Sequence, residues 1–376
     1  MKNKKLGRNI TILAVFLAFM GMGVVDPILP DIAKKLGANH WQIEMLFSSY
    51  ILMMAFMMLP AGILATKFGD KNIMVIGLGS VALFSTLCAF SGSILDLSLF
   101  RAGWGFSNAL FFSTALIILI VLSDEYHEAV GYFEGSIGIG ISAGPLLGGF
   151  LGEHSWRYPF LATGLLALCA FFAVLFFVKV PKSKDKRKTV SFSDLKQLFT
   201  NKKFIIISIS AMLYFYGFIV ILAYSPLVVN LNPIEMGLLF FAWGLALAAG
   251  SIIISTKLEQ FYKVKNIVPV TIFIFALIQL IILNVESKAL MSMLIIFSGL
   301  LSGINNSLLT SYVMEVQFEK NIISGGFNFL RWTGAATAPV LSGFIAQSFN
   351  NMHLPFLVAA ILSIISFVLL FNLRKA

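Results

Sequence analysis

Four ionisable residues, Asp26, Arg101, Glu134 and Arg331, lie inside long apolar segments of this 376-residue sequence. Charged groups are costly in a hydrocarbon environment and by default mark a functional site there, with a structural ion pair as the alternative. We expect Asp26, near the end of its segment, and Arg101, near the start of its own, at matching depths about 6 Å below the outer surface of the membrane. Burial weakens the acidity of a carboxyl group and a nearby arginine strengthens it. Asp26 is therefore predicted to carry a proton that Arg101 modulates; the alternative is a fixed pair that only orients two segments.

The other two charged residues differ in depth. Glu134 lies five residues into its segment and is predicted to be a second proton site or a group that attracts cations, with a hydrogen-bonded boundary residue as the alternative. Arg331 lies about 13 Å into its segment, close to the middle of a bilayer. A cation at that depth must pair with a carboxylate or meet an anionic ligand; packing against polar groups of neighbouring segments is the other interpretation.

A cavity around Arg331 would also receive polar and aromatic side chains from other segments, although most such residues serve helix packing. The ligand-binding candidates are Asn108, Asn305, Asn328 and Tyr214, with Ser107, Asn306, Tyr50, Tyr216 and Trp243 as further contributors.

The composition indicates that lipid surrounds these residues. Hydrophobic residues make up 59% of the chain and charged residues 12%, whereas soluble domains have about 45–50% and about 25%. Water-soluble enzymes, disordered chains and disulfide scaffolds are therefore poor interpretations, and the two cysteines lie in apolar runs that predict neither a disulfide nor a metal site.

A membrane-spanning helix needs about 20 apolar residues. The predicted spans are 10–30, 43–65, 73–91, 97–122, 129–152, 159–178, 204–229, 236–256, 267–284, 289–313, 322–346 and 354–373.

The basic residues set the orientation of these twelve spans. With a cytoplasmic N-terminus, 21 of the 27 Lys and Arg residues fall on the inner side, four fall outside, and two lie within spans. Positive charge accumulates on the cytoplasmic side of membrane proteins, so both termini are expected to be cytoplasmic. The chain is predicted to divide into a six-helix half at 1–178, a cytoplasmic linker at 179–203 and a second six-helix half at 204–376.

An internal repeat supports two similar halves. Small residues and one proline in the fifth span recur 194 residues later in the eleventh span, which is the pattern of a parallel repeat. Glycines spaced every four residues lie on one face of the helix, and because they have no side chain another helix can approach this face closely. The proline permits a bend in the helix. The fifth-span positions are Gly131, Gly140, Gly144, Pro145, Gly148 and Gly149, and their counterparts are Gly325, Gly334, Ala338, Pro339, Ser342 and Gly343.

The fifth-span pattern, Gly131-x8-Gly140-x3-Gly144-Pro145-x2-Gly148-Gly149, resembles the complete fifth-helix motif of the drug:proton antiporters of the major facilitator superfamily. The stretch Gly62-Ile-Leu-Ala-Thr-Lys-Phe-Gly-Asp-Lys resembles the family's loop motif, which includes Gly69 and Asp70. The stretch Leu97-x3-Arg101-x2-Trp104-Gly105 resembles its fourth-span motif. The resemblance covers the twelve-span plan and implies the major facilitator fold, and it also gives Arg101 a coupling role.

Three positions depart from the family pattern. Thr66 stands where the loop motif has an acidic residue, Asp70 where it has a basic one, and Trp104 where the fourth-span motif has glutamine. The family's acidic residue helps to hold the two halves together on the cytoplasmic side. Thr66 can supply a hydrogen bond there but no charge, so gating and substrate details are expected to differ.

The resemblance implies a proton-coupled exporter of small amphipathic or drug-like compounds that works by alternating access. The alternative is a dedicated exporter of an anionic metabolite, such as a siderophore or an acidic lipid, with Arg331 as the counter-charge. The sequence contains no GxxxxGK[ST] loop, which an ATP-driven transporter would need. It also shows no cluster of a nucleophile with a base, or of metal ligands, that would indicate an intramembrane enzyme. A non-transporting sensor would leave the buried charges unexplained.

The expected partners follow from this interpretation. We expect a small-molecule substrate, protons and the lipid bilayer, with no cofactor, no metal and no nucleic acid. The protein is expected to be a monomer and a multi-pass protein of a bacterial cell membrane.

Overall fold

The computed structural model describes residues 2–25, 28–38, 40–180, 192–229, 231 and 233–375, and the regular structure in these ranges is helical. Eleven spans in this part of the chain are long and apolar enough to cross a membrane. The helix over the predicted span 322–346 has the length of a span, 29 residues, but is less apolar because it is rich in small and polar residues and contains Arg331. The prediction of an all-α membrane protein is confirmed.

After the first span, the helices follow the predicted spans within a few residues, with two short helices in addition. The first six long helices and a short one are α1 (Lys2–Gly23), α2 (Leu29–Leu36, short), α3 (His40–Phe68), α4 (Asp70–Ala89), α5 (Ile94–Leu122), α6 (Tyr126–Gly152) and α7 (Tyr158–Phe177). The later elements are α8 (Phe192–Thr200, short), α9 (Lys202–Val229), α10 (Pro233–Ala249), η2 (Gly250–Ile254), α11 (Ser255–Phe261), α12 (Val264–Ile282), α13 (Lys288–Met314), α14 (Lys320–Ser348) and α15 (Leu354–Lys375).

The first helix ends earlier in the chain than the sequence predicted. We expected a span from 10 to 30, but α1 ends at Gly23 and α2 begins at Leu29. Glycine weakens a helix, and a continued helix would bring the ring of Pro27 against the carbonyl group of Gly23. The predicted proton carrier Asp26 therefore follows α1 in the chain, and it lies outside the described residues.

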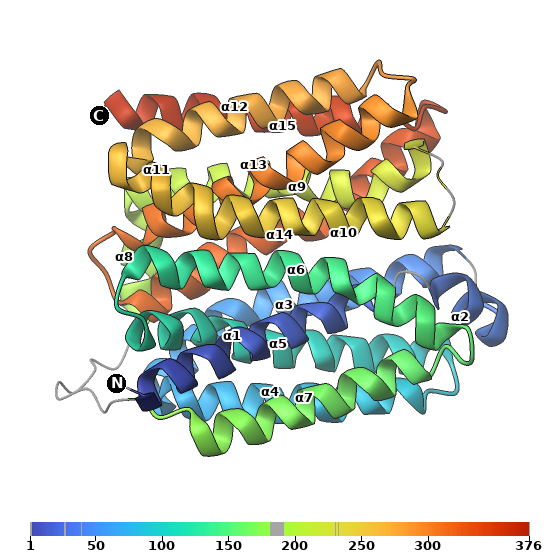
Figure 1. Ribbon diagram of the computed structural model, residues 1–376, viewed down its shortest axis with the longest axis horizontal. Helices are drawn as coiled ribbons and strands as arrows, with labels where there is room; N and C mark the ends of the chain where they lie inside the picture. Colours follow the sequence, from blue (N-terminus) through green and yellow to red (C-terminus); the bar gives the residue numbers. More distant parts are fainter. Residues whose placement is uncertain are drawn as a thin grey trace. The chain divides into compact units, whose positions relative to one another are not determined.

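The helices form two compact units. The first contains residues 1–195 and 319–329, and the second contains residues 196–318 and 330–376. In the first unit, α5 packs against α3 and α4, α4 packs against α7, and α1 packs against α6 and α7 (Figure 1). In the second unit, α13 packs against α10 and α12, α12 packs against α15, and α9 packs against α13 and α15. Helices at corresponding places in the chain therefore make corresponding contacts in the two units.

The ends of these helices are joined by ion pairs in each unit. In the first unit the Lys4 ammonium group donates hydrogen bonds to the Asp124 carboxylate at 2.9 Å and to the Ser123 carbonyl oxygen at 3.0 Å. The hydrogen bond and the positive charge of Lys4 hold the pKa of Asp124 below its ordinary value. In the second unit Lys203 pairs with Glu315 at 2.9 Å. Both pairs are solvent-exposed and therefore contribute little to stability.

The predicted halves at 1–178 and 204–376 stay a prediction, since part of the linker 179–203 lies outside the described residues.

Candidate functional site

Arg101 is held inside the first unit by α3. It lies in α5, which begins at an N-cap where Ser93 accepts a hydrogen bond from the Asp96 backbone, and its side chain is 1% exposed. Its Nε donates to the Leu46 carbonyl oxygen at 2.8 Å. The guanidinium group lies over the Tyr50 ring, 5.0 Å from the ring centre. A buried cation in contact with an aromatic face and a carbonyl is stabilised by both, so α3 and α5 form one charged, desolvated site.

Trp104 and Asn108 extend this site along α5. The Asn108 amide donates to the Tyr50 hydroxyl group, and both side chains are buried. The Trp104 ring packs edge-on to the rings of Tyr50 at 5.8 Å and Phe160 at 6.3 Å. A Cβ added at Gly21 would lie 3.0 Å from the Trp104 ring. The departure from glutamine at position 104 therefore places a large ring in a space between α1, α3 and α7.

Glu134 lies apart from Arg101. It is 1% exposed and is the ninth residue of α6, whereas Arg101 is near the start of α5. Because α5 and α6 are consecutive spans that run in opposite directions, the helical rise puts the two residues roughly 20 Å apart along the membrane normal. The structure therefore does not bring Glu134 to Arg101, and the third predicted proton-coupling residue, Asp26, lies outside the described part of the chain.

Arg331 is the buried cation of the second unit. It lies near the middle of α14 and is 2% exposed, and its predicted depth in the bilayer stays a prediction. Its Nη1 donates to the Thr310 hydroxyl oxygen at 3.3 Å, and its guanidinium group lies over the Phe215 ring at 4.6 Å. Phe215 in turn packs edge-on to Trp332 at 5.3 Å. Sequence reasoning missed Thr310 and Phe215 because neither residue belongs to a motif.

The four predicted ligand-binding side chains besides Arg331 all have hydrogen-bond partners. Asn108 binds Tyr50, as described above. In the second unit, Asn305 accepts from Thr271 at 2.5 Å, and the Tyr214 hydroxyl donates to the Ser302 carbonyl oxygen at 3.4 Å. In the first unit, the Asn328 amide donates to the carbonyl oxygen of Ser324, one turn earlier in α14, at 3.0 Å. Each of these bonds helps to fix a side chain, and the binding role of all four stays a prediction.

The glycine face of α6 packs directly on α1. A Cβ added at Gly140 would lie 2.6 Å from the Phe16 carbonyl oxygen, and one added at Gly144 would lie 2.5 Å from the Met20 carbonyl oxygen. Backbone contacts this close require glycine. In the second unit a Cβ at Gly334 would overlap the Met212 carbonyl oxygen of α9, so the repeated pattern makes the same kind of contact there. Gly149 differs, because a Cβ there would have nothing within 4 Å.

The loop motif contacts the start of α14 inside the first unit. A Cβ at Gly62 would lie 2.6 Å from the Asn321 carbonyl oxygen, and the Asn321 amide donates to the Asp70 carboxylate at 2.9 Å. Gly69 has a φ of 86°, which favours glycine. The Thr66 hydroxyl instead donates to Ile63 in its own helix at 2.7 Å. The side chain of the motif that hydrogen-bonds to α14 is therefore Asp70, at a position where the family has a basic residue.

We predict that Asp70→Ala lowers the free energy of unfolding by about 1–3 kcal/mol, because it leaves the buried amide of Asn321 without its acceptor. Asp70 and Asn321 are 3% and 1% exposed. Asp70→Asn keeps an acceptor oxygen and is expected to retain most of the stability. Thermal unfolding of the purified protein in detergent measures both variants, and equal loss in Asp70→Ala and Asp70→Asn would contradict the role of the hydrogen bond.

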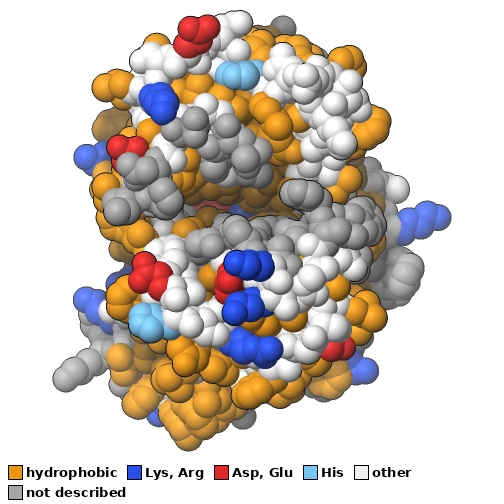
Figure 2. All heavy atoms as spheres, turned by 90° about the vertical axis from the view of Figure 1, so that its right-hand side faces the viewer, with side chains coloured by type: hydrophobic (Ala, Val, Ile, Leu, Met, Phe, Trp, Pro, Cys, Tyr) orange, Lys and Arg blue, Asp and Glu red, His pale blue; other side chains and the backbone are white. Residues whose placement is uncertain are grey.

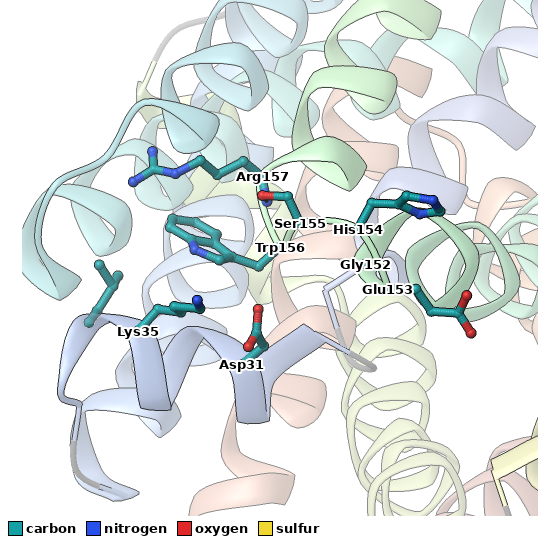
Figure 3. Close-up of a pocket in the computed structure, with 9 residues that line it drawn as sticks. Asp31, Lys35, Gly152, Glu153, His154, Ser155, Trp156 and Arg157 are labelled. Atoms are coloured by element: carbon teal, nitrogen blue, oxygen red, sulfur yellow. The ribbon is translucent and has the colours of Figure 1, made fainter.

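A surface pocket of about 490 Å³ lies in the first unit between α2 and the turn that joins α6 to α7. Asp31 and Lys35 point from α2 toward Trp156, whereas the Glu153 carboxylate points away (Figure 3). On this face of the first unit, basic side chains lie beside acidic side chains (Figure 2). Sequence reasoning did not find this pocket, because its residues come from two connecting segments without a motif. Its mixed charge favours neither anions nor cations, so we assign it no role in transport.

Comparison with known proteins is consistent with this architecture. A family model described as the Major Facilitator Superfamily matches residues 11–338, so the chain belongs to this superfamily of membrane transporters. It is 34% identical to the multidrug efflux protein YfmO of Bacillus subtilis strain 168, over 96% of this chain and 91% of that protein. It is 26% identical to the quinolone resistance protein NorA of Staphylococcus aureus strain MRSA252, over 90% and 89%.

A solved structure has the same fold. The crystal structure of the human organic anion transporter MFSD10 (TETRAN) superimposes with a TM-score of 0.83 and 15% identity, covering 98% of this chain and 99% of that one. The predicted major facilitator fold is therefore confirmed, and the protein is an integral membrane protein with many spans.

Proposed function

We propose that this protein is a proton-coupled exporter of small amphipathic or drug-like compounds, which acts by alternating access between its two six-helix halves. The observation that carries the proposal is the similarity to the multidrug efflux protein YfmO along 365 residues, nearly the whole chain. The relative named for quinolone resistance supports the same class of cargo. The glycine contacts of α6 on α1 and of α14 on α9 supply helix pairs that can pack closely and still slide or bend.

The proposal assigns proton coupling to Asp26, Arg101 and Glu134. The burial of Arg101 and its contacts with Leu46 and Tyr50 support a fixed cation on the outer side of the first unit. Glu134, which is also buried, would act as a separate proton site nearer the other membrane surface. Substrate binding is assigned to Arg331 with Asn108, Asn305, Asn328 and Tyr214. We further propose that the protein is a monomer of a bacterial cell membrane with both termini in the cytoplasm.

The second candidate function is export of a dedicated anionic metabolite. One observation favours it, namely the guanidinium group of Arg331 near the middle of α14, buried against an aromatic ring. A cation at that depth attracts a negative group more strongly than it would in water, because the surroundings have a low dielectric constant.

Proton flux tests the proposed function. Purified protein in proteoliposomes with an internal pH-sensitive dye receives lipophilic cations, neutral drugs or anionic chelators under an imposed proton gradient. We expect cations or neutral drugs to trigger proton flux, and Asp26→Asn to lower it at least about tenfold, because an amide cannot carry the proton. Asp124→Asn, which changes an exposed carboxylate of a loop, is the control and should leave flux unchanged.

The outcomes separate the candidate functions. Flux triggered only by anionic compounds would favour the dedicated metabolite exporter. Asp26→Asn protein that still transports at full rate with the proton gradient would contradict the role of Asp26 as the carrier.

A further inference from the structure

Asn306 has an unusual environment in the second unit. Its side chain is 1% exposed, and neither its Nδ2 nor its Oδ1 has a hydrogen-bond partner in the described part of the chain. Buried polar groups are paired in the large majority of cases, because an unpaired one loses its bonds to water without replacement. The neighbouring Asn305, which is 0% exposed, accepts a hydrogen bond from Thr271 through its Oδ1, so only its Nδ2 is unpaired among the described residues, whereas both amide atoms of Asn306 are unpaired. The Asn306 amide therefore needs a partner that these helices do not supply.

The position of Asn306 on α13 places it beside the buried cation. Gly299, Gly303, Asn306 and Thr310 follow one another at intervals of four, three and four residues, so they lie on one face of the helix. Thr310 accepts the hydrogen bond of Arg331. Asn306 is thus one helical turn, about 6 Å along the axis, from the Thr310–Arg331 contact.

The helix that faces this stripe has an irregular turn. Residues Gly250–Ile254 between α10 and α11 form one turn of π-helix, a feature found frequently at functional sites. This turn packs against α13: a Cβ at Gly250 would overlap the Leu300 carbonyl oxygen, and a Cβ at Gly303 would lie 2.8 Å from the Ser251 backbone nitrogen. Just after the turn, Ser255 donates to the Ser307 hydroxyl at 3.1 Å. The irregular turn and the unpaired amide therefore occur in the same part of the second unit.

Aromatic rings lie next to the same groups. Phe215, under the Arg331 guanidinium, is stacked on Phe218 at 4.7 Å, and Phe218 contacts Trp243 at 5.5 Å. Trp243 is 0% exposed and its Nε1 has no hydrogen-bond partner among the described residues. A Cβ at Gly299 would lie 2.8 Å from the Trp243 ring, so this second unpaired donor lies on the Asn306 face of α13, two turns away. Flat apolar surface and unpaired polar groups together suit an aromatic ligand with polar substituents.

We propose that Asn306 is a specificity-determining residue, which binds a carbonyl-containing polar group, such as a carboxyl or an amide, on an aromatic cargo molecule. Its Nδ2 donates to the carbonyl oxygen and its Oδ1 accepts from an adjacent O–H or N–H, while Arg331 supplies positive charge one turn away. This inference rests on the proposed function of the protein as a small-molecule exporter.

The first test compares two neighbouring asparagines. Asn305→Ala and Asn306→Ala change the same residue type in the same helix at equally buried positions, so differences in helix propensity cancel. Asn305→Ala removes the hydrogen bond with Thr271 and should lower the Tm of the purified protein. Asn306→Ala removes an unpaired amide and should leave the Tm unchanged or raised. Asn306→Leu, which fills the space with an apolar side chain, provides a second variant if the alanine leaves a cavity.

The second test measures transport in proteoliposomes with two probes. Norfloxacin has an aromatic body with a keto oxygen and a carboxyl group, whereas tetraphenylphosphonium has no hydrogen-bonding group. We expect Asn306→Ala to lower kcat/KM for norfloxacin about tenfold or more, the usual loss for a hydrogen bond to a bound substrate. Transport of tetraphenylphosphonium should stay within about twofold of the unmodified protein.

The outcomes distinguish failure of the proposal from failure of the proposed function. The proposal is overturned if Asn306→Ala and Asn306→Leu lose as much Tm as Asn305→Ala, or if both probes are affected equally or not at all. Unmodified protein that transports neither probe contradicts only the proposed function. In that case the proposal is tested by the change in Tm when norfloxacin is added to the unmodified protein and to Asn306→Ala. A rise in Tm of the unmodified protein that is abolished in Asn306→Ala supports the proposal. No rise in the unmodified protein, or an equal rise in both proteins, overturns it.

Discussion

Gly144→Val should abolish export, because the added side chain would have to occupy the space of the α1 backbone. A Cβ at this position would lie 2.5 Å from the Met20 carbonyl oxygen and 2.7 Å from the Cα of Gly23. Overpacking typically costs about 1–3 kcal/mol and occasionally more, and here the neighbouring atoms belong to a backbone that cannot rotate away. We therefore expect a loss at or above the upper end of this range, measured as a lower Tm in detergent together with loss of drug-driven proton flux.

Gly149→Val is the matched control for this prediction. It makes the same substitution in the same helix and within the same motif, so the change in intrinsic helix propensity is shared. A Cβ at Gly149 has nothing within 4 Å, and export should continue. Similar loss in both variants would show that the motif acts through helix flexibility and not through the contact of α6 with α1. Gly334→Val tests the equivalent contact in the second unit, where the Cβ would overlap the Met212 carbonyl oxygen.

The second large effect is expected at Arg331. Arg331→Ala removes the buried guanidinium group that lies over Phe215 and donates to Thr310. Charge-assisted hydrogen bonds contribute about 1.5–3 kcal/mol, which corresponds to roughly 10–100-fold in kcat/KM for a cargo molecule with a carboxylate or carbonyl oxygen. Transport assays in proteoliposomes with norfloxacin and tetraphenylphosphonium measure this loss, which should be confined to norfloxacin.

Two further variants separate charge from geometry at this site. Arg331→Lys keeps the positive charge but lacks the planar group that stacks on a ring, so partial activity toward norfloxacin is expected. Thr310→Val removes the hydroxyl acceptor while keeping the arginine, and should have a smaller effect. If Arg331→Ala lowers the Tm and the transport of both probes together, Arg331 is a packing residue and the predicted contact with cargo is wrong.

The span pattern was predictable from the sequence because it depends on local composition. About 20 consecutive apolar residues are needed to cross a bilayer, and that property is independent of the neighbours of each helix. The span predicted at 43–65 is α3, His40–Phe68, and the span predicted at 289–313 is α13, Lys288–Met314. The predicted end of the first span was wrong by several residues, because the apolar sequence continues past Gly23 although the helix ends there.

The chemical environment of each motif residue could not be read from the sequence. Gly144 and Gly149 are equal members of one pattern, but only Gly144 faces a backbone within contact distance. Thr66 occupies the motif's acidic position, but Asp70 makes the hydrogen bond to Asn321, 251 residues away in the chain. The predicted binding residue Asn305 binds Thr271, whereas Asn306 has no partner among the described residues.

The sequence by itself therefore determined the membrane environment, the span pattern and the residues that are charged within it, since these depend on residue type and short-range order. The tertiary structure alone decided which glycine is in contact, which asparagine is paired and what surrounds Arg331. The physical reason is that one residue along a helix turns a side chain by about 100°, so adjacent residues of the same type face different neighbours from distant parts of the chain.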